Sequence, residues 1–372
     1  MRKSLSWQAC ALGLLSLGAA SAQPAKWRLQ YSYDQIKTEL QIRDLAMPSA
    51  KRGIAIGTIQ DDRGGSRKNV AVVTSDGGEH WEITKVDEQP ETLFFLNDTL
   101  GWMVTEKGLW HTEEAGKEWK KLPKPPVPVV RVFFVDENTG WAACLKKTVL
   151  VTHDGGHKWE TVKASQELPG SVDRSAYTWI SFATRDYGIV LGFNQPVPRW
   201  GSPFPAWMDP EDALTRRDAP HLAYTLVTRD QGKTWKGGST SLFGQITRAR
   251  FIEKGPGLGL IEMGRASSFP SEVYELDWHT GKNQTVFRDK RYYITDVWLT
   301  PSGTYYLAGV EVVGQVRSIA PGPVKVFKST DRRTWSQMPV DYRAVAQRAT
   351  LSGVGEDDLW LATDNGMILK LK

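Results

Sequence analysis

The side chains most able to do chemistry in this chain are arginines inside short apolar stretches. Five of them lie in stretches typical of strands: Arg43, Arg131, Arg248, Arg250 and Arg348. A guanidinium carries a fixed charge and a planar fork of donors that matches a carboxylate. Counting in steps of two places Arg131, Arg248 and Arg250 on one strand face, and the same counting places Arg43 on the other. The pattern predicts a cationic site for an acidic peptide or another carboxylate.

The alternative for these arginines is a structural one. Solvated guanidiniums, or ion pairs with neighbours such as Glu91 and Asp296, explain the same residues without a ligand. Both interpretations stay open at the level of sequence.

A second candidate for binding is a segment from about residue 194 to 221 that is rich in proline and aromatic residues. It contains Arg199, Trp200 and Trp207. Loops this long inside a compact domain usually have a function, and exposed tryptophans stack on sugars or anchor partner proteins. We expect the segment to be an inserted loop that caps one end of the fold. A lid that packs on its own neighbours is the structural alternative.

Other chemistries find little support. Four of the six histidines lie in or beside turns, and Cys144 lies in an apolar stretch typical of an inert core thiol, so no metal site is expected. No glycine-rich motif that cradles phosphate precedes a helix. The formal charge is only +5, and no run of five or more like charges occurs, which argues against nucleic acid as a partner.

A repeated turn motif sets the framework for these residues. The pattern Thr-x-Asp-x-Gly-x-x-Trp occurs at 74–81, 152–159 and 228–235, with degenerate copies at 112–119 and 329–335. In such a turn the aspartate accepts backbone hydrogen bonds, the glycine supplies a positive φ, and the tryptophan fixes the turn to a sheet. The acidic and tryptophan positions are Asp76, Trp81, Glu114, Trp119, Asp154, Trp159, Asp230, Trp235, Asp331 and Trp335. We expect a structural role for all of them.

A second pattern, a large apolar residue followed six positions later by glycine, gives the number of units. Clear copies begin at Phe95, Phe134, Phe182 and Phe251, and weaker ones at Met47, Trp298 and Gly353. Each unit holds short apolar runs at spacings near 40 residues, which is typical of a propeller blade. The sequence therefore predicts an all-β, seven-bladed β-propeller of four-stranded antiparallel blades.

The two ends of the chain predict how the ring closes. The last unit ends at Lys372, too early to hold its own outer strand. Residues 26–32 form a strand led by Trp27 that has no blade of its own. We expect this N-terminal strand to complete the last blade and remove an exposed edge.

With these motifs the chain resembles the Asp-box (BNR) repeat propellers of the sialidase-like superfamily. The Gly101-Trp102 and Gly140-Trp141 strands, each followed by such a turn, are closest in pattern to the photosystem II assembly and stability factors and their bacterial relatives. The resemblance covers nearly the whole chain from Trp27. It implies a propeller fold and no cofactor, and the superfamily includes glycosidases, lectin-like binders and assembly factors.

Hydrolysis is the second function that this resemblance implies. A sialidase-like enzyme needs an Arg-Ile/Leu-Pro motif near the N-terminus. The most similar segment here, Ile42-Arg43-Asp44-Leu45, has no proline. Other glycosidases need only two suitably spaced carboxylates. Two facing carboxylates at the channel mouth, one with a raised pKa, would favour an enzyme.

The N-terminus predicts export. Residues 1–22 combine Arg2 and Lys3, an apolar stretch and an Ala20-Ser-Ala22 cleavage pattern, as in a signal peptide. Cys10 precedes the apolar stretch, so no lipoprotein anchor is expected, and no later stretch is long and apolar enough to span a membrane. We expect residues 23–372 to form one periplasmic or secreted propeller. Its channel mouth would bind a protein partner, or alternatively a glycan, without intrinsic catalysis.

Overall fold

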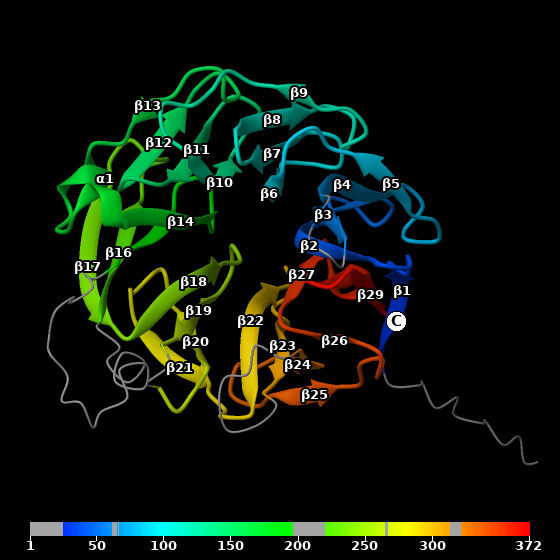
Figure 1. The fold of residues 1–372 in the computed structure, drawn as a ribbon. Helices are drawn as coiled ribbons and strands as arrows, with labels where there is room; N and C mark the ends of the chain where they lie inside the picture. Colours follow the sequence, from blue (N-terminus) through cyan, green and yellow to red (C-terminus); the bar gives the residue numbers. More distant parts are fainter. Residues whose placement is uncertain (1–24, 62–64, 66, 196–219, 265–266, 313–320) are drawn as a thin grey trace, which may run out of the picture.

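The computed structural model describes residues 25–61, 65, 67–195, 220–264, 267–312 and 321–372. Seven antiparallel sheets stand side by side in a closed ring around a central channel (Figure 1). The predicted seven-bladed propeller is therefore confirmed. Within the described ranges, helix is limited to α1 (Ala164–Glu167) and two short 3₁₀ segments, Val172–Arg174 and Glu356–Asp358, and none of these could cross a membrane.

The first four blades each consist of four consecutive strands, ordered from the channel outward. Blade 1 is β2 (Thr38–Ala46), β3 (Gly53–Asp61), β4 (Arg67–Thr74) and β5 (Glu82–Lys85). Blade 2 is β6 (Pro90–Phe95), β7 (Gly101–Thr105), β8 (Gly108–Thr112) and β9 (Lys120–Lys121). Blade 3 is β10 (Val129–Phe134), β11 (Gly140–Cys144), β12 (Thr148–Thr152) and β13 (Glu160–Thr161). Blade 4 is β14 (Ser175–Phe182), β15 (Gly188–Asn194), β16 (His221–Thr228) and β17 (Lys236–Leu242).

Blades 5 and 6 continue the pattern, and blade 7 departs from it. Blade 5 is β18 (Gly244–Arg250), β19 (Gly257–Met263), β20 (Ser271–Leu276) and β21 (Asn283–Phe287). Blade 6 is β22 (Tyr292–Leu299), β23 (Tyr305–Glu311), β24 (Gly322–Ser329) and β25 (Ser336–Met338), with β26 (Val345–Ala346) also paired to β24. Blade 7 is β27 (Ala349–Gly353), β28 (Leu359–Thr363), β29 (Met367–Leu371) and β1 (Trp27–Ser32).

The ring closes through β1, as the sequence predicts. β1 pairs antiparallel with β29 from Trp27↔Leu371 to Ser32↔Met367, so the first strand supplies the outer edge of the last blade (Figure 1). Trp27 is fully buried in the core between blades 6 and 7. Closure removes a free sheet edge and joins the chain ends through the hydrophobic core.

The aromatic-glycine pattern has a direct structural cause. Phe134 and Gly140 lie opposite each other on β10 and β11, and a Cβ at Gly140 would stand 2.4 Å from the Phe134 ring. Phe95 covers Gly101 in the same way, with a corresponding distance of 2.6 Å. The glycine leaves room for an aromatic ring over the neighbouring strand at the start of blades 2 to 5.

The Thr-x-Asp turns lie at the end of the ring where the inner strands finish. In the third blade, Asp154 Oδ1 accepts hydrogen bonds from the Lys158 amide at 2.8 Å and the Thr152 hydroxyl at 2.9 Å. Gly156 has a φ of +100°, and Trp159 Nε1 donates to the Gly156 carbonyl at 2.9 Å. These contacts hold each hairpin shut. Cys144 is buried in this blade, and burial raises the pKa of its thiol.

Candidate functional site

A bulge in each of the inner strands β2, β6, β10, β14, β18 and β22 determines which side chains enter the channel. In each strand the bulge leaves one residue unpaired, and the residue that follows it occupies the equivalent position in all six strands. A bulge re-aims the side chains that follow it. The first layer after the bulges is Asp44, Thr92, Arg131, Trp179, Arg248 and Asp296. The second layer, two residues further on, is Ala46, Phe94, Phe133, Ser181, Arg250 and Trp298.

Three of the predicted arginines meet around one indole in this channel. The guanidiniums of Arg131, Arg248 and Arg250 lie 4.4, 4.7 and 5.4 Å from the ring of Trp179. Trp179 is fixed because its Nε1 donates to the Ala249 carbonyl at 2.7 Å. Cation–π contacts of this kind stabilise a charge that has lost much of its water.

Two aspartates pair with these arginines. Arg131 Nη2 lies 3.3 Å from Asp44 Oδ2. The Asp296 carboxylate lies 3.3 Å from Arg248 Nε and 3.5 Å from Arg250 Nη2. The pairing of Arg248 and Arg250 with Asp296 is the structural alternative that the sequence left open. Ion pairing therefore accounts for part of the arginine cluster.

Both aspartates also connect neighbouring blades through the backbone. Asp44 accepts the Leu93 amide of blade 2 at 3.0 Å, and Asp296 accepts the Leu351 amide of blade 7 at 2.9 Å. Each also caps the amide that follows it in its own strand. Each carboxylate thus has two backbone donors and at least one arginine as partners.

The channel has an excess of positive charge. Three guanidiniums face two carboxylates, and the Nε of Arg250 is buried without a hydrogen-bond partner among the described residues. Burial, together with repulsion from Arg248 and Arg250, lowers the pKa of Arg131 to about 10 despite the attraction of Asp44. Arg131 remains charged at neutral pH, and a buried unpaired donor costs about 1–3 kcal/mol. An anion bound in the channel would balance the excess positive charge and accept a hydrogen bond from the Nε of Arg250.

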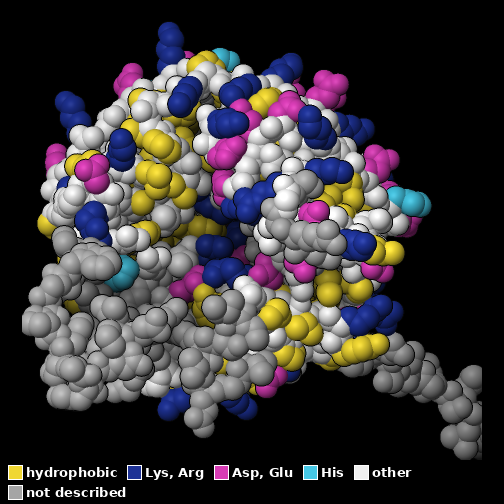
Figure 2. All heavy atoms as spheres, in the orientation of Figure 1, with side chains coloured by type: hydrophobic (Ala, Val, Ile, Leu, Met, Phe, Trp, Pro, Cys, Tyr) yellow, Lys and Arg dark blue, Asp and Glu magenta, His cyan; other side chains and the backbone are white. Residues whose placement is uncertain are grey.

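Aromatic rings line the cavity beside the arginines. Phe94 and Phe133 lie 4.9 Å apart, and the Arg250 guanidinium lies 4.4 Å from the ring of Trp298. A cavity of about 260 Å³ extends from Asp44 and Arg131 to these rings. Figure 2 shows dark blue basic side chains gathered around the central opening. The cavity combines cationic and apolar walls.

The other predicted arginines lie elsewhere. Arg43 occupies the bulge of β2, outside the Trp179 group, and its Nη1 binds Glu91 at 2.6 Å. Arg348 makes a two-pronged ion pair with Glu262, at 2.6 and 3.0 Å, and also donates to the Tyr293 hydroxyl. Arg199, Trp200 and Trp207 lie outside the described residues, as does the predicted signal peptide.

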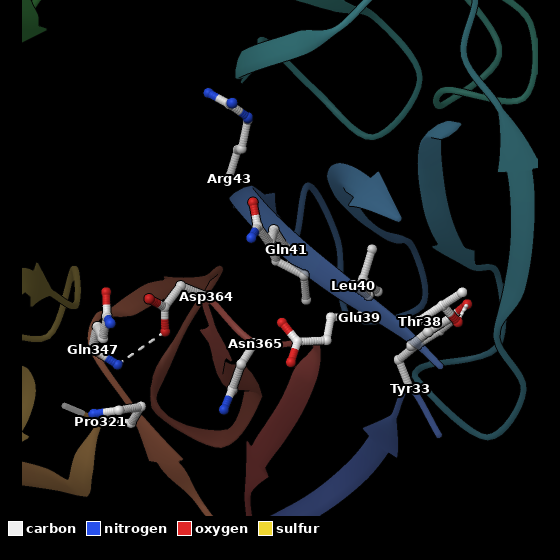
Figure 3. Close-up of a pocket in the computed structure, with 11 residues that line it drawn as sticks. Tyr33, Thr38, Glu39, Leu40, Gln41, Arg43, Pro321, Gln347, Asp364 and Asn365 are labelled. Atoms are coloured by element: carbon white, nitrogen blue, oxygen red, sulfur yellow. Dashed lines mark hydrogen bonds between the residues drawn. The ribbon is translucent and has the colours of Figure 1, made fainter. Parts of the chain in front are cut away.

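A polar groove of about 530 Å³ borders the channel at the junction of blades 1 and 7 (Figure 3). Glu39, Gln41 and Arg43 follow one another along β2, and Asp364 and Asn365 stand across from them. Asp364 Oδ1 accepts the amides of Gln347 and Arg348, at 3.1 and 3.2 Å. The groove is thus rich in acceptors, in contrast to the arginine cavity.

The shifted carboxyl groups among the described residues are stabilised in their ionised form. In the described ranges, every Asp or Glu whose pKa departs from its ordinary value is lowered, as in Glu262, where burial is outweighed by Arg348 and Tyr293. Burial also raises the pKa of Tyr293, whose hydroxyl binds Glu262. At the surface, the possible ligand atoms of Asp76, Glu79 and His80 lie within 4.8 Å of one another. Asp76 there already accepts hydrogen bonds within its own turn.

The fold and the channel together define a seven-bladed propeller with an arginine- and aromatic-lined cavity. No protein-family model matches the chain. A stretch of 163 residues is 24% identical to photosystem II assembly lipoprotein Ycf48 from Synechococcus sp. (strain RCC307). The match covers 39% of this chain and 48% of that protein, so it spans about half the length of this curated relative.

Solved structures show the same fold over the whole ring. Ycf48 bound to a D1 peptide has a TM-score of 0.58 at 16% identity, covering 97% of this chain and 99% of that one. Ycf48 from Cyanidioschyzon merolae has a TM-score of 0.54 at 16% identity, covering 93% and 98%. The WD40 propeller domain of Doa1 reaches 0.55 at 9% identity, covering 93% and 96%. Because such different propellers match equally well, the likeness shows the fold alone.

Sequence reasoning missed the layer of residues that organises the channel. Asp44 and Trp179 do not stand out in the sequence, because period-two counting along a strand does not include the bulges that aim them into the channel. A signal for the two aspartates was present: Ile42-Arg-Asp44-Leu and Ile294-Thr-Asp296-Val share the spacing Ile-x-Asp-apolar, and in both strands the register shift lies between the isoleucine and the aspartate.

Proposed function

We propose that this chain is an exported binding protein that holds an acidic segment of a partner protein in its channel and serves in assembly rather than catalysis. The sequence similarity to Ycf48 and the likeness to a Ycf48 that carries a D1 peptide support a peptide as the ligand. The observation that carries the proposal is the excess guanidinium charge around Trp179, where the Nε of Arg250 has no hydrogen-bond partner among the described residues.

The cavity favours a particular kind of peptide. A carboxylate would reach Arg131 and Arg250, and an adjacent apolar side chain would lie against Phe94, Phe133 or Trp298. Charge attraction from the channel would steer the acidic segment and weaken with salt. Arg43 and Arg348, which lie outside the Trp179 group and pair with Glu91 and Glu262, contribute to the rim rather than to the binding of the carboxylate.

The proposal can be tested with a fluorescein-labelled peptide, Gly-Ala-Glu-Phe-Glu-Ala-Gly, and its glutamine counterpart, by fluorescence anisotropy. We expect saturable binding of the glutamate peptide and a loss of affinity of roughly 10- to 100-fold in the Arg131→Gln, Arg250→Gln double variant. The matched control is Arg291→Gln, Arg343→Gln, which removes two surface arginines. Equal binding by all three proteins would contradict the proposal.

Export and the domain boundaries belong to the same proposal. We infer that residues 1–22 are removed and that residues 23–372 act as one propeller, with the segment from about 194 to 221 inserted in blade 4. N-terminal sequencing of the protein recovered from outside the cytoplasm should begin at Gln23. A mature chain that still begins at Met1 would contradict this part.

A further inference from the structure

The outer edge of blade 4 differs from the outer edges of the other blades. β17 is seven residues long and has a single charged residue, Lys236, at one end. It pairs with β16 at seven successive positions, from His221↔Leu242 to Val227↔Lys236, without a bulge. The corresponding outer strands are shorter: β1 has six residues, β21 five, β5 four, β25 three, and β9 and β13 two each.

The two longest of those other edges carry protective features that β17 lacks. β1 has a bulge at Leu29/Tyr31, and β21 has one at its pairing with Val273 and Tyr274. Natural sheets use bulges, charges and short edge strands to prevent pairing with another chain. β17 pairs only with β16 among the described strands, so one row of its backbone groups faces outward. Its residues are mostly exposed and small: Lys-Gly-Gly-Ser-Thr-Ser-Leu.

An apolar slot lies beside this edge, between blades 4 and 5. It has a volume of about 460 Å³ and extends from Ile246 near the channel to Thr240 and Leu242 of β17. The described core of this seam has only three buried residues, Trp179, Leu191 and Ala249. The seam between blades 3 and 4 has nine. Blades 4 and 5 are therefore incompletely packed toward the outside of the ring.

The register of β17 connects the edge to the slot. Thr240 and Leu242 line the slot, whereas Gly237, an odd position, faces the opposite side, where an added Cβ would lie 2.9 Å from Leu168. A strand added to the edge of β17 would continue the sheet, and every second side chain would then point toward the slot. Main-chain pairing would give affinity, and the slot would select apolar side chains.

The charged residues at one end of the slot indicate which type of residue the ligand should carry at that end of the added strand. Lys282 lines the slot, and Lys236 lies on the slot face of β17 by register; both are exposed and have no ion pair among the described residues. The nearby carboxylates of Asp230 and Asp277 accept hydrogen bonds within their own turns. An acidic residue on the ligand would complement the two lysines.

We propose that blade 4 carries a second docking site, in which an extended segment of a partner protein pairs with β17. Its apolar side chains, at every second position, enter the slot between blades 4 and 5, and an acidic residue at its end reaches Lys236 and Lys282. This site is separate from the arginine channel and does not depend on the function proposed for it.

The test uses the peptide Ac-Val-Thr-Val-Thr-Val-Thr-Glu-NH2, whose glutamate lies on the same strand face as its valines, and amide hydrogen exchange of the full chain. At a peptide concentration about ten times the dissociation constant, the outward amides of β17 should exchange about tenfold more slowly. Thr240→Lys should abolish this protection by placing a charge in the slot, while Ser239→Lys, on the other face, should retain it. Lys236→Glu with Lys282→Glu should weaken binding about three- to tenfold.

Three results would overturn the proposal. The first is unchanged exchange at 236–242, whether or not the peptide binds. The second is equal binding of the scrambled peptide Ac-Thr-Thr-Thr-Val-Val-Val-Glu-NH2. The third is protection that appears only when residues 196–219 are replaced by a short Gly-Ser linker, because the edge would then be occupied by the chain itself. Near-UV circular dichroism of each variant establishes that it is folded, and Arg131→Gln should leave the result unchanged.

Discussion

Arg131 in blade 3 donates to the carboxylate of Asp44 in blade 1, with 3.3 Å between Nη2 and Oδ2. The pair bypasses blade 2, yet the same Asp44 carboxylate accepts the Leu93 amide of blade 2. One side chain thus links three blades at the channel. Asp296 does the same for blades 5, 6 and 7 through Arg248, Arg250 and Leu351. The arginine site is therefore also part of what holds the ring together.

Removing the Asp296 carboxylate should destabilise the ring strongly. Asp296→Ala leaves two guanidiniums and the Leu351 amide without their acceptor in a buried place. We expect a loss of about 3–5 kcal/mol in the free energy of unfolding, measured by urea denaturation. Asp98→Ala, an exposed carboxylate, serves as the control and should change little. A loss below about 1 kcal/mol for Asp296→Ala would show that the pairing is not structural.

The closure of the ring should depend on Trp27. Its side chain is fully buried between blades 6 and 7, so Trp27→Ala should cost about 3–5 kcal/mol of stability. Amides of β29, which pair with β1, should lose protection from exchange. Tyr342→Ala, at a residue 90% exposed, provides the comparison. If β29 stays protected in Trp27→Ala, closure depends on the hydrogen-bonded strands rather than on the tryptophan.

The degenerate turn of blade 2 offers a stabilising substitution. Glu114 stands where the other turns have aspartate, and its carboxylate makes no hydrogen bond with the described residues, whereas Asp154 caps the Lys158 amide. Glu114→Asp should restore the cap and raise the free energy of unfolding by about 0.5–1 kcal/mol. Glu113→Asp, next to it, should have no effect. A loss of stability in Glu114→Asp would show that the geometry of this turn does not allow an aspartate at position 114 to cap the backbone amides.

Stability should fall below pH 5 in part because of Glu88. Burial opposes ionisation of this carboxyl, but hydrogen bonds from Lys121, Thr105 and Trp110 outweigh it and lower its pKa to about 2. Because the folded pKa lies below the unfolded value, the contribution is complete above about pH 4.5 and is lost as the pH falls toward 2. Glu88→Gln should flatten the decline of unfolding free energy between pH 5 and 2, by an amount on the order of 2 kcal/mol. An identical pH profile in the variant would contradict this assignment.

Much of the fold could be predicted from the sequence because its repeats have local causes. Phe134 over Gly140 and Asp154 in its turn are contacts within one blade, so their spacing survives in the sequence and counts the blades. The unpaired strand led by Trp27 predicted the closure, which is confirmed by its pairing with β29.

The channel could be predicted only in part because its contacts join different blades. Period-two counting grouped Arg131 with Arg248 and Arg250, but it could not show that bulges bring Asp44 and Trp179 into the same layer. It also could not show that Arg348 would find Glu262, 86 positions away. Such pairings depend on how the blades are arranged around the ring, which no local pattern encodes.

The most direct measurement of the channel's role is NMR of the arginine Nε–Hε groups during titration with the glutamate peptide. The account predicts saturable shifts for Arg131 and Arg250, whose guanidiniums line the cavity. Arg291 and Arg343, each bound to an aspartate two residues away at the surface, should not move. A peptide that binds while Arg131 and Arg250 keep their resonances would contradict the claim that the channel is the binding site.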